Sequence, residues 1–340
     1  MRDVTLGLVG VGRIGAMHAA TISGLDETPN PERTRIRLKL TDVAQDHARS
    51  VAAGLGAEFL PSVEELIASG IDGLVIATGT ATHPGLIMAG VDAGIPVFCE
   101  KPVAMNVEDS LPVLNYIRQK GGTVQIGHQR RFDAGYLEAK RAFEAGELGW
   151  IHTVRAVTGD MTPPPVEFLA GSGGLFRDCS VHDFDILRWI TGREIVEVYA
   201  KGSNNGDPAI GAVGDVDTAL AVVTFDDGMV GTVAATRYNG AGHDVRLEIQ
   251  GSQGSVMVGL DEQSALRSAE PGADFSFGTP HRTFAERFQE AYRSELAAFV
   301  DVVLGRRTNP CAPEDAVVAS VVADAAQESL ETGAPVRVAL

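Results

Sequence analysis

Lys101 is the first residue whose type and position could do chemistry. It stands in the segment Cys99-Glu100-Lys101-Pro102, after an apolar run that predicts a strand from Ile95 to Cys99. Doubly wound sheets bind their ligands at the carboxyl ends of parallel strands, so we expect this lysine to point into a crevice. A surface turn is the plain alternative for a Lys-Pro pair.

Asp178 and His182 form a second candidate pair, four residues apart where a helix is predicted from Val181 to Thr191. That spacing stacks two side chains on one face if the helix begins by Asp178. A carboxylate beside an imidazole can hold one tautomer and tune it as a base near neutral pH. A histidine satisfied within the core is the structural alternative for His182.

A glycine-rich loop, GVGRIG at residues 10–15, lies between a predicted strand, Val4 to Val9, and a predicted helix. Gly10 would make the turn, Gly12 would let the backbone approach a pyrophosphate, and Gly15 would let helix and strand pack closely. This pattern predicts a dinucleotide site. An ordinary strand-to-helix turn is the alternative.

Asp42 ends the second predicted strand, where an acidic side chain can accept hydrogen bonds from both ribose hydroxyls of NAD. It lies 27 residues past Gly15, against the ~20 typical of this motif, and the polar insert from Asp26 to Arg35 accounts for the excess as a longer loop. No arginine follows to receive the extra phosphate of NADP, so we expect NAD. A helix N-cap is the alternative for Asp42.

Strands and helices alternate over residues 1–128, which predicts an α/β domain with a parallel sheet. Ser62 and Glu65 form a capping box, and Asn106 is placed to cap a helix. We place the domain boundary near His128. The further strands expected are 73–77, 95–99 and 123–127, and the further helices are 44–54, 84–92 and 106–120.

Residues 129–340 predict an α+β domain. Runs rich in Val, Thr and Ala are joined by Asp227-Gly228 and by a turn at residues 251–254, which are hairpin signals of an antiparallel sheet. Two helices, about 284–304 and 314–331, complete the chain. We expect the later helix to pack back on the first domain.

The length, hydrophobic content and net charge of the chain limit which binding partners are expected. The chain has 340 residues, 44% of them hydrophobic, enough for two domains with real cores. The formal net charge is −17, which repels phosphate backbones and anionic lipid surfaces. We therefore expect a small-molecule partner, and neither nucleic acid nor membrane.

The cysteines, Cys99, Cys179 and Cys311, lie far apart and form no CxxC pair, so neither a disulfide framework nor a zinc knuckle is predicted. We therefore expect the protein to be located in the cytoplasm, where its cysteines stay reduced, and we expect no targeting segment in the sequence. Histidine spacing gives no zinc helix either, so no metal is expected.

Four segments together resemble the family of glucose–fructose oxidoreductase and inositol dehydrogenase (Gfo/Idh/MocA), nicotinamide-dependent sugar and polyol oxidoreductases. The resemblance spans most of the chain and implies a Rossmann domain, then a substrate domain whose large, open, mainly antiparallel sheet builds dimers or tetramers. The segments are GVGRIG, TGTATHPGLIMAGVDAGIPVFCEKP, QIGHQRRFDAGY and GGLFRDCSVHDFDILRWITG.

Carried onto this sequence, the resemblance implies a catalytic set of Lys101, Asp178 and His182. His182 would take the hydroxyl proton, Lys101 would hydrogen-bond the same oxygen, and Asp178 would position one of them. The family commonly has a cis bond between Lys101 and Pro102. The expected cofactor-binding residues are Gly10, Gly12, Arg13, Ile14, Gly15, Asp42, Thr78, His83, Glu100 and Lys101.

The substrate side is most similar to the inositol dehydrogenases. The segment QIGHQRRFDAGY implies that Gln129, Arg130 and Arg131 lie near the sugar and the nicotinamide, with a structural role as the alternative for Arg131. Tyr238 would line the polyol pocket, and Asp160 could bind a hydroxyl. The expected substrate-binding residues are Lys101, Gln129, Arg131, Asp160, Asp178, His182 and Tyr238.

The function expected is NAD-dependent oxidation of a secondary hydroxyl of a cyclic polyol or sugar. The leading candidate reaction is the oxidation of myo-inositol to 2-keto-myo-inositol. Alternatives are a dehydrogenase of scyllo-inositol, glucose, xylose or an anhydrosugar, and an enzyme that retains NAD for net elimination or hydrolysis. A regulator without catalysis would be expected to lack the lysine or the histidine, and both are present.

Overall fold

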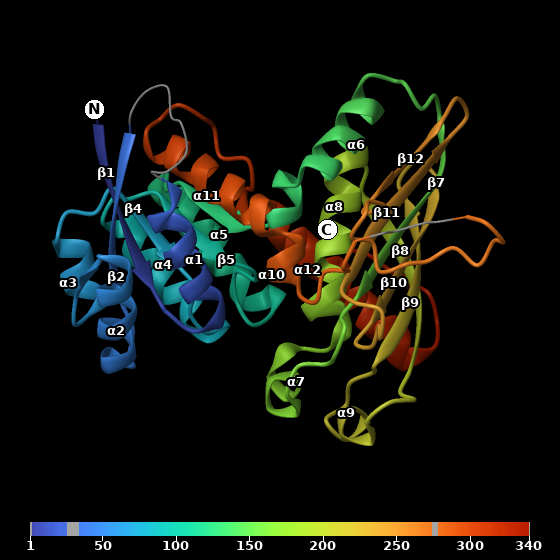
Figure 1. Ribbon diagram of the computed structural model, residues 1–340, viewed down its shortest axis with the longest axis horizontal. Coiled ribbons are helices and arrows are strands. Elements are labelled where there is room, and N and C mark those ends of the chain that lie inside the picture. The colour runs from blue at the N-terminus through green and yellow to red at the C-terminus, as the bar shows by residue number, and fades with distance from the viewer. Residues whose placement is uncertain (1, 26–33, 274–277, 340) are drawn as a thin grey trace. The chain divides into compact units, whose positions relative to one another are not determined.

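The computed structural model describes residues 2–25, 34–273 and 278–339. The chain divides into two compact units (Figure 1). The first comprises Met1–Gln129 and Glu290–Val317, and the second Arg130–Gln289 and Val318–Leu340. Most of the insert that the sequence interpretation used to explain the distance from Gly15 to Asp42 lies outside the described residues.

The first unit is built on a parallel sheet of six strands in the order β3-β2-β1-β4-β5-β6, which is the Rossmann order and confirms that prediction. The order reverses beside β1, so the carboxyl ends of β1 and β4 flank the switch point where such sheets bind ligands. The strands are β1 (Arg2–Val9), β2 (Thr34–Thr41), β3 (Glu58–Phe59), β4 (Gly73–Ile76), β5 (Val97–Glu100) and β6 (Val124–Gly127).

Helices of the first unit begin where local chemistry caps them. The Ser62 hydroxyl accepts a hydrogen bond from the Glu65 amide at 3.2 Å, and Asn106 accepts one from the Asp109 amide at 2.7 Å, as the sequence predicted. The helices are α1 (Arg13–Ser23), α2 (Gln45–Leu55), α3 (Val63–Ala68), α4 (His83–Asp92) and α5 (Val107–Lys120).

Helix α11 (Gln289–Val303) belongs almost entirely to the first unit, which differs from the sequence division at residue 128. Its buried Leu296, Phe299 and Val300 share one apolar core with residues of β1 and β2. Of the later helix α12 (Pro313–Thr332), only the beginning belongs to the first unit. Burial of apolar side chains far along the chain thus sets the division, and no local signal marks it.

The second unit carries a sheet of seven strands in the order β12-β11-β7-β10-β9-β8-β13. Among the described strands of this sheet, only β7 and β10 pair in parallel, so the prediction of a mainly antiparallel sheet is confirmed. The strands are β7 (Ile151–Gly159), β8 (Ile195–Ser203), β9 (Thr218–Phe225), β10 (Val230–Thr236), β11 (Asp244–Gly251), β12 (Ser255–Val258) and β13 (Val336–Arg337).

Helical segments of this unit include α8 (Val181–Thr191), which has the bounds that the sequence predicted and contacts β7. A π-helical turn, Phe176–Ser180, leads directly into α8. The single long helix expected over residues 284–304 is interrupted, since α10 and α11 are separate. The remaining helices are α6 (Ala134–Glu144), α7 (Val166–Ser172), α9 (Pro208–Ala212) and α10 (Phe284–Arg287).

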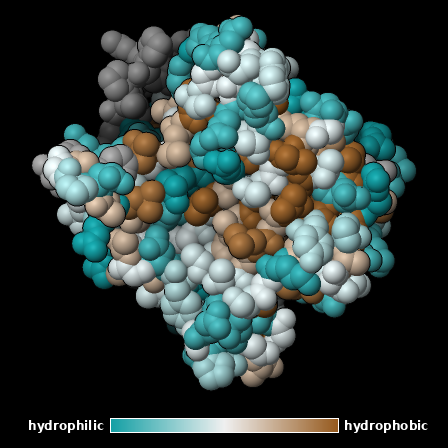
Figure 2. Space-filling model, turned by 90° about the vertical axis from the view of Figure 1, so that its right-hand side faces the viewer, coloured by the Kyte–Doolittle hydropathy of each residue, from teal (hydrophilic) through white to brown (hydrophobic). Residues whose placement is uncertain are grey.

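One face of the second sheet is open and carries apolar side chains, seen as brown areas in Figure 2. Strand alternation explains this face, because β9 buries Ala219, Ala221 and Val223 and exposes Leu220 and Val222. The strand register aligns one row across this face of the sheet, composed of the exposed Tyr199, Val222, Thr232, Arg155 and Met257 and the half-buried Glu248.

No helix within the described residues is long and apolar enough to cross a membrane.

Candidate active site

The glycine loop between β1 and α1 is shaped as a phosphate cradle requires. Gly10 has a φ of +91°, and a Cβ there would lie 2.7 Å from the Ala77 carbonyl oxygen, while a Cβ on Gly15 would overlap the Gly10 carbonyl. A Cβ on Gly12 would meet nothing within 4 Å. Helix α1 begins here without a side-chain cap, so its first amides face that open space. An open, uncapped helix N-terminus fits a pyrophosphate.

Asp42 fastens this loop to the end of β2. Its Oδ2 accepts a hydrogen bond from the Val11 amide at 2.7 Å, and Oδ1 accepts one from the Ala44 amide at 2.8 Å. Helix α2 begins at Gln45 with Ala44 as its N-cap, so Asp42 is not the helix cap that was the alternative. Each carboxylate oxygen has a second acceptor position, which suits the predicted bonds from two ribose hydroxyls.

Lys101 directly follows β5 and is half-buried, and its peptide bond to Pro102 is cis, as the resemblance implied. The preceding Glu100 contacts the buried His18, with 2.6 Å between Oε1 and Nε2. Burial raises the pKa of Glu100, but the hydrogen bond and charge of His18 and the charge of Lys101 outweigh it and lower the pKa overall. The residue before the lysine is thereby fixed inside the unit.

His83 joins two loops at the same sheet edge. It is buried, with Nδ1 2.7 Å from the Pro102 carbonyl oxygen and Nε2 3.2 Å from the Thr78 carbonyl oxygen. The Thr78 hydroxyl in turn contacts that of Thr82 at 2.7 Å. His83 therefore braces the backbone beside Lys101, whatever further contact it makes with a cofactor.

The segment of Asp178 departs from the sequence expectation. Asp178 lies in the π-helical turn, and the α-helix begins only at Val181, so the regular four-residue stacking with His182 does not apply across this pair. His182 occupies the first turn of α8 and is half-buried. The Asp178 carboxylate accepts a hydrogen bond from the guanidinium of Arg237 at 3.1 Å.

Two neighbouring arginines at residues 130 and 131 form buried ion pairs. Arg131 donates from Nε and Nη2 to both oxygens of Asp185, at 2.9 and 2.5 Å. Arg130 donates to Asp183 at 2.5 Å, and burial raises the pKa of Asp183 despite that partner. This geometry supports the structural alternative for Arg131. Gln129, also predicted to bind substrate, is buried at the start of the 3-10 turn, Gln129–Phe132, that also contains the two arginines.

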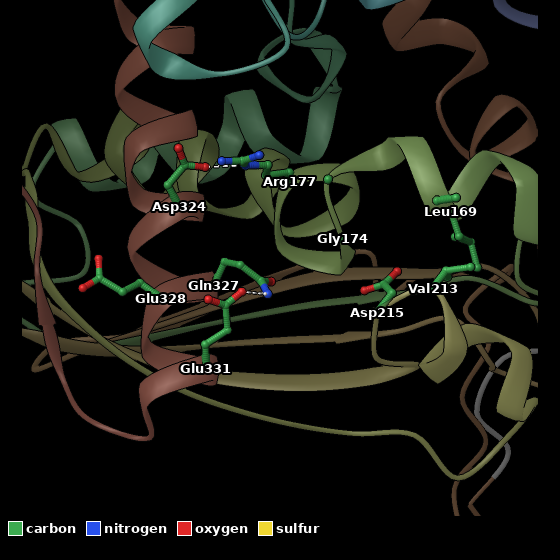
Figure 3. A pocket seen from close by; sticks show the side chains of 12 residues that line it. Leu169, Gly174, Arg177, Val213, Asp215, Asp324, Gln327, Glu328 and Glu331 are labelled. Carbon is green, nitrogen blue, oxygen red and sulfur yellow. Dashed lines mark hydrogen bonds and ion pairs between the residues drawn. The ribbon is translucent and has the colours of Figure 1, made fainter.

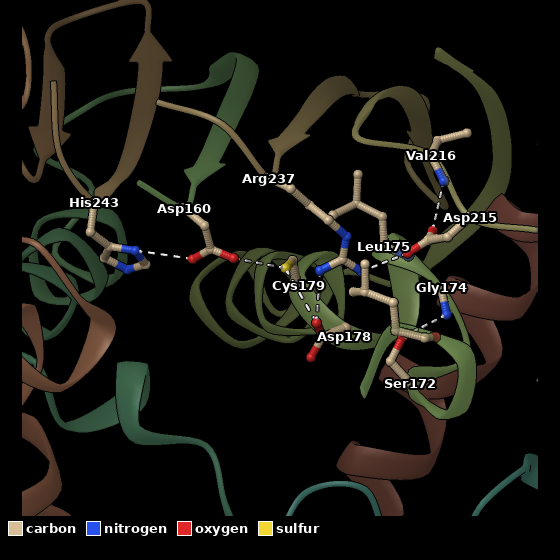
Figure 4. A network of polar contacts seen from close by, with 11 residues as sticks. Asp160, Ser172, Gly174, Leu175, Asp178, Cys179, Asp215, Val216, Arg237 and His243 are labelled. Atoms are coloured by element: carbon tan, nitrogen blue, oxygen red, sulfur yellow. Dashed lines mark hydrogen bonds and ion pairs between the residues drawn. The ribbon is translucent and has the colours of Figure 1, made fainter. Parts of the chain in front are cut away.

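Asp160 and Tyr238 follow neighbouring strands, β7 and β10, and Asp160 belongs to the polar network drawn in Figure 4. Asp160 Oδ1 lies 3.2 Å from Nδ1 of the buried His243, and its Oδ2 lies 3.8 Å from the Cys179 sulfur. Tyr238 is 40% exposed, and its ring borders Gly206. The sequence interpretation missed His243 as a partner of Asp160, because no spacing rule links the two positions.

A cavity of about 410 Å³ lies in the second unit, between α7 and α12 (Figure 3). Arg177 and Asp324 form an ion pair in its wall. The cavity contains none of the predicted site residues, although Asp215 in its lining also contacts Arg237.

Each group of predicted residues is assembled within its own unit. The glycine loop, Asp42, Thr78, His83, Glu100, Lys101 and Gln129 belong to the first unit. Arg131, Asp160, Asp178, His182 and Tyr238 belong to the second. Their catalytic and binding roles remain predictions.

Comparison with known families gives two matches that cover most of the chain. Residues 4–128 match the model of an oxidoreductase family with an NAD-binding Rossmann fold, and residues 136–257 match the GFO/IDH/MocA C-terminal domain. The chain belongs to the Gfo/Idh/MocA oxidoreductase family. This confirms the resemblance drawn from the four sequence segments.

Relatives within the Gfo/Idh/MocA family share most of their length with this chain. A myo-inositol dehydrogenase of Streptomyces leeuwenhoekii is 36% identical, covering 91% of each chain. An NAD⁺-dependent scyllo-inositol 2-dehydrogenase of Bacillus subtilis is 35% identical, covering 98% of this chain and 96% of its own. The crystal structure of a Lactobacillus casei scyllo-inositol dehydrogenase with NAD(H) and scyllo-inositol has a TM-score of 0.87 at 29% identity, covering both chains fully.

Proposed function

We propose that this protein is an NAD-dependent dehydrogenase that oxidises a secondary hydroxyl of a cyclic polyol, with myo-inositol to 2-keto-myo-inositol as the first candidate reaction. The observation that carries the proposal is the nearly full-length similarity to myo- and scyllo-inositol dehydrogenases. The sequence resemblance carries the family's catalytic lysine, aspartate and histidine onto Lys101, Asp178 and His182.

NAD would be held by backbone and side chains of the first unit. The amides at the start of α1 would receive the pyrophosphate, in the space that the absent side chain of Gly12 leaves open. Asp42 would accept the ribose hydroxyls, and Arg13 and Ile14 would line the loop. Thr78, His83 and Glu100 would border the nicotinamide end. Bound NAD supplies the hydride acceptor, at C4 of the nicotinamide.

The chain's own residues would manage the hydroxyl proton. His182 would accept that proton as the hydride leaves the carbon, and Lys101 would donate a hydrogen bond to the same oxygen. Asp178 would orient one of these two groups. A proton acceptor and a cationic donor acting on one oxygen favour the alkoxide as it develops.

A cyclic polyol carries hydroxyls around its ring, so its pocket needs several polar side chains and little phosphate-binding charge. Asp160, Tyr238 and Gln129 would supply such groups. Arg131 would contribute chiefly by holding Asp185, since its buried ion pair occupies both Nε and Nη2.

The open face of the second sheet would pair with a second copy of the chain. Tyr199, Val222 and Met257 are exposed along one row, and an uncovered apolar sheet face is a common interface. We propose a homodimer or homotetramer assembled through this face.

A substrate panel tests the proposal. Purified protein is mixed with NAD or NADP and with myo-inositol, scyllo-inositol, glucose, xylose or galactose, and NADH absorbance is recorded. We expect NADH with an inositol and little product with NADP, because of Asp42. Full NAD binding without turnover of any polyol or sugar would contradict the dehydrogenase assignment and favour an enzyme that retains NAD.

A further inference from the structure

Arg237 is a completely buried arginine at the end of β10, and it lies between two carboxylates of the second unit (Figure 4). Its Nη1 donates to Oδ2 of Asp178 at 3.1 Å, and its Nη2 donates to Oδ2 of Asp215 at 2.8 Å. Burial alone would lower the pKa of Arg237, but the neighbouring Cys179, Asp178 and Asp215 raise it overall. The guanidinium therefore stays cationic inside the unit and bridges both acids.

Asp215 extends this bridge to the backbone that carries Asp178. Its Oδ1 accepts hydrogen bonds from the amides of Leu175 at 2.9 Å and Val216 at 2.8 Å. Leu175 directly precedes the π-helical turn in which Asp178 lies. One carboxylate thus fixes both the arginine that holds the Asp178 side chain and the start of its helical turn.

We propose that Arg237, supported by Asp215, is a positioning residue for the reaction: it fixes the orientation of the Asp178 carboxylate. This inference rests on the proposed function, in which Asp178 acts beside the reacting hydroxyl. The hydrogen bond from Nη1 holds Oδ2 toward the buried guanidinium and so restricts rotation of the carboxylate. Arg237 itself acts only through Asp178.

A second buried arginine provides a matched control. Arg188 donates from Nε and Nη2 to both oxygens of Glu194, at 2.6 and 2.8 Å. This ion pair belongs to the same unit but involves none of the predicted site residues. Loss of a buried arginine can therefore be compared with and without a link to Asp178.

The activity test uses Arg237→Met, Arg237→Lys and Asp215→Asn, with Arg188→Met, Arg188→Lys and Glu194→Gln as controls. We expect kcat to fall about 100-fold in Arg237→Met and about tenfold in Arg237→Lys and Asp215→Asn, as for a misplaced catalytic group. KM for NAD should not change, and the controls should retain wild-type kcat. Wild-type kcat per folded molecule in Arg237→Met and Asp215→Asn would overturn the proposal.

A thermal-stability arm separates this inference from the proposed function. Unfolding is measured for Arg237→Met, Asp178→Asn and the double variant, and we expect non-additive effects because the two side chains are in contact. Additive effects would overturn the bridge. If the wild-type protein oxidises no polyol in the panel while the coupling is present, the proposed function fails and the contact stands.

Discussion

The candidate cofactor site and the candidate substrate site differ in the groups that form them: backbone in the first, side chains in the second. In the first unit the candidate phosphate cradle is formed by backbone, at Gly10, Gly12 and Gly15, which have no side chains. In the second unit the polar groups are held by buried ion pairs, such as Arg131 with Asp185.

This difference determines how each site responds to change. A backbone site fails when a side chain is added, because space or a helix N-terminus is lost. A site held by buried charges fails when a side chain is removed, because its partner is left buried and unpaired. The following predictions test this contrast, from the largest expected effect to the smallest.

Removing a predicted catalytic side chain should have the largest effect. Lys101→Ala and His182→Ala should each lower kcat by about 10²–10⁴-fold, the usual contribution of acid–base groups. NAD affinity, measured by NADH fluorescence titration, should stay near the wild-type value because neither residue lies in the phosphate cradle. A loss of NAD binding equal to the loss of kcat would mean that both residues act through cofactor binding and not on the hydroxyl proton.

Breaking a buried ion pair should destabilise the second unit. Arg131→Ala leaves the Asp185 carboxylate buried without its bidentate partner, which typically costs about 3–5 kcal/mol. Chemical denaturation measures this change in the free energy of unfolding. Arg141→Ala, which breaks exposed ion pairs with Glu138 and Glu147, serves as the control and should change the free energy of unfolding far less, because solvent screens exposed pairs. Equal effects would refute the role of burial.

Two glycines of the cradle should separate binding from folding. Gly12→Ala places a methyl group in open space, so Tm should not change while NAD affinity falls about tenfold, or about 1.4 kcal/mol. Gly15→Ala places its Cβ against the Gly10 carbonyl, so Tm should fall. The free energy of unfolding should decrease by about 1–3 kcal/mol. The contrast fails if Gly12→Ala unfolds the protein or binds NAD normally.

Glu295, on α11, should give the smallest effect, visible as a pH dependence. Burial, and then the charge of Glu100, raise its pKa well above the usual value, although a backbone hydrogen bond from His128 opposes this. Above about pH 4.3, where the unfolded chain loses this proton, the folded protein still binds it. Stability from this group therefore declines as the pH rises toward its folded-state pKa.

The variant Glu295→Gln removes that decline. Thermal melts of both proteins are recorded at pH 8 and at pH 5. The Tm of the variant should exceed that of the wild-type protein by a few degrees at pH 8 and by less at pH 5. A Tm advantage that is largest at pH 5 would contradict the raised pKa.

Most of the first unit could be predicted from sequence because its signals are local. The loop at residues 10–15, the caps at Ser62 and Asn106, and the acid at Asp42 each act within a few residues or at a strand end. The assignment of α11 to this unit could not be predicted, because Phe299 is buried against β1 and β2, which lie near the other end of the sequence.

The substrate side was less predictable because its partners are distant in sequence. Arg237 meets Asp178 across 59 positions, and His243 meets Asp160 across 83 (243 minus 160). No periodicity in the sequence indicates that such distant residues are paired. The π-helical turn at residues 176–180 likewise has no sequence signal, so the condition set for stacking Asp178 on His182, an α-helix that begins by Asp178, is not met.

The measurement that tests the central claim most directly follows the hydrogen itself. The wild-type protein is incubated with NAD and with myo-inositol that carries deuterium at C2, and the recovered cofactor is analysed by NMR. The account predicts deuterium at nicotinamide C4, in a one-to-one ratio with 2-keto-myo-inositol, and a transfer about 10²–10⁴-fold slower with Lys101→Ala. Unlabelled cofactor beside a bound and unchanged polyol would contradict it.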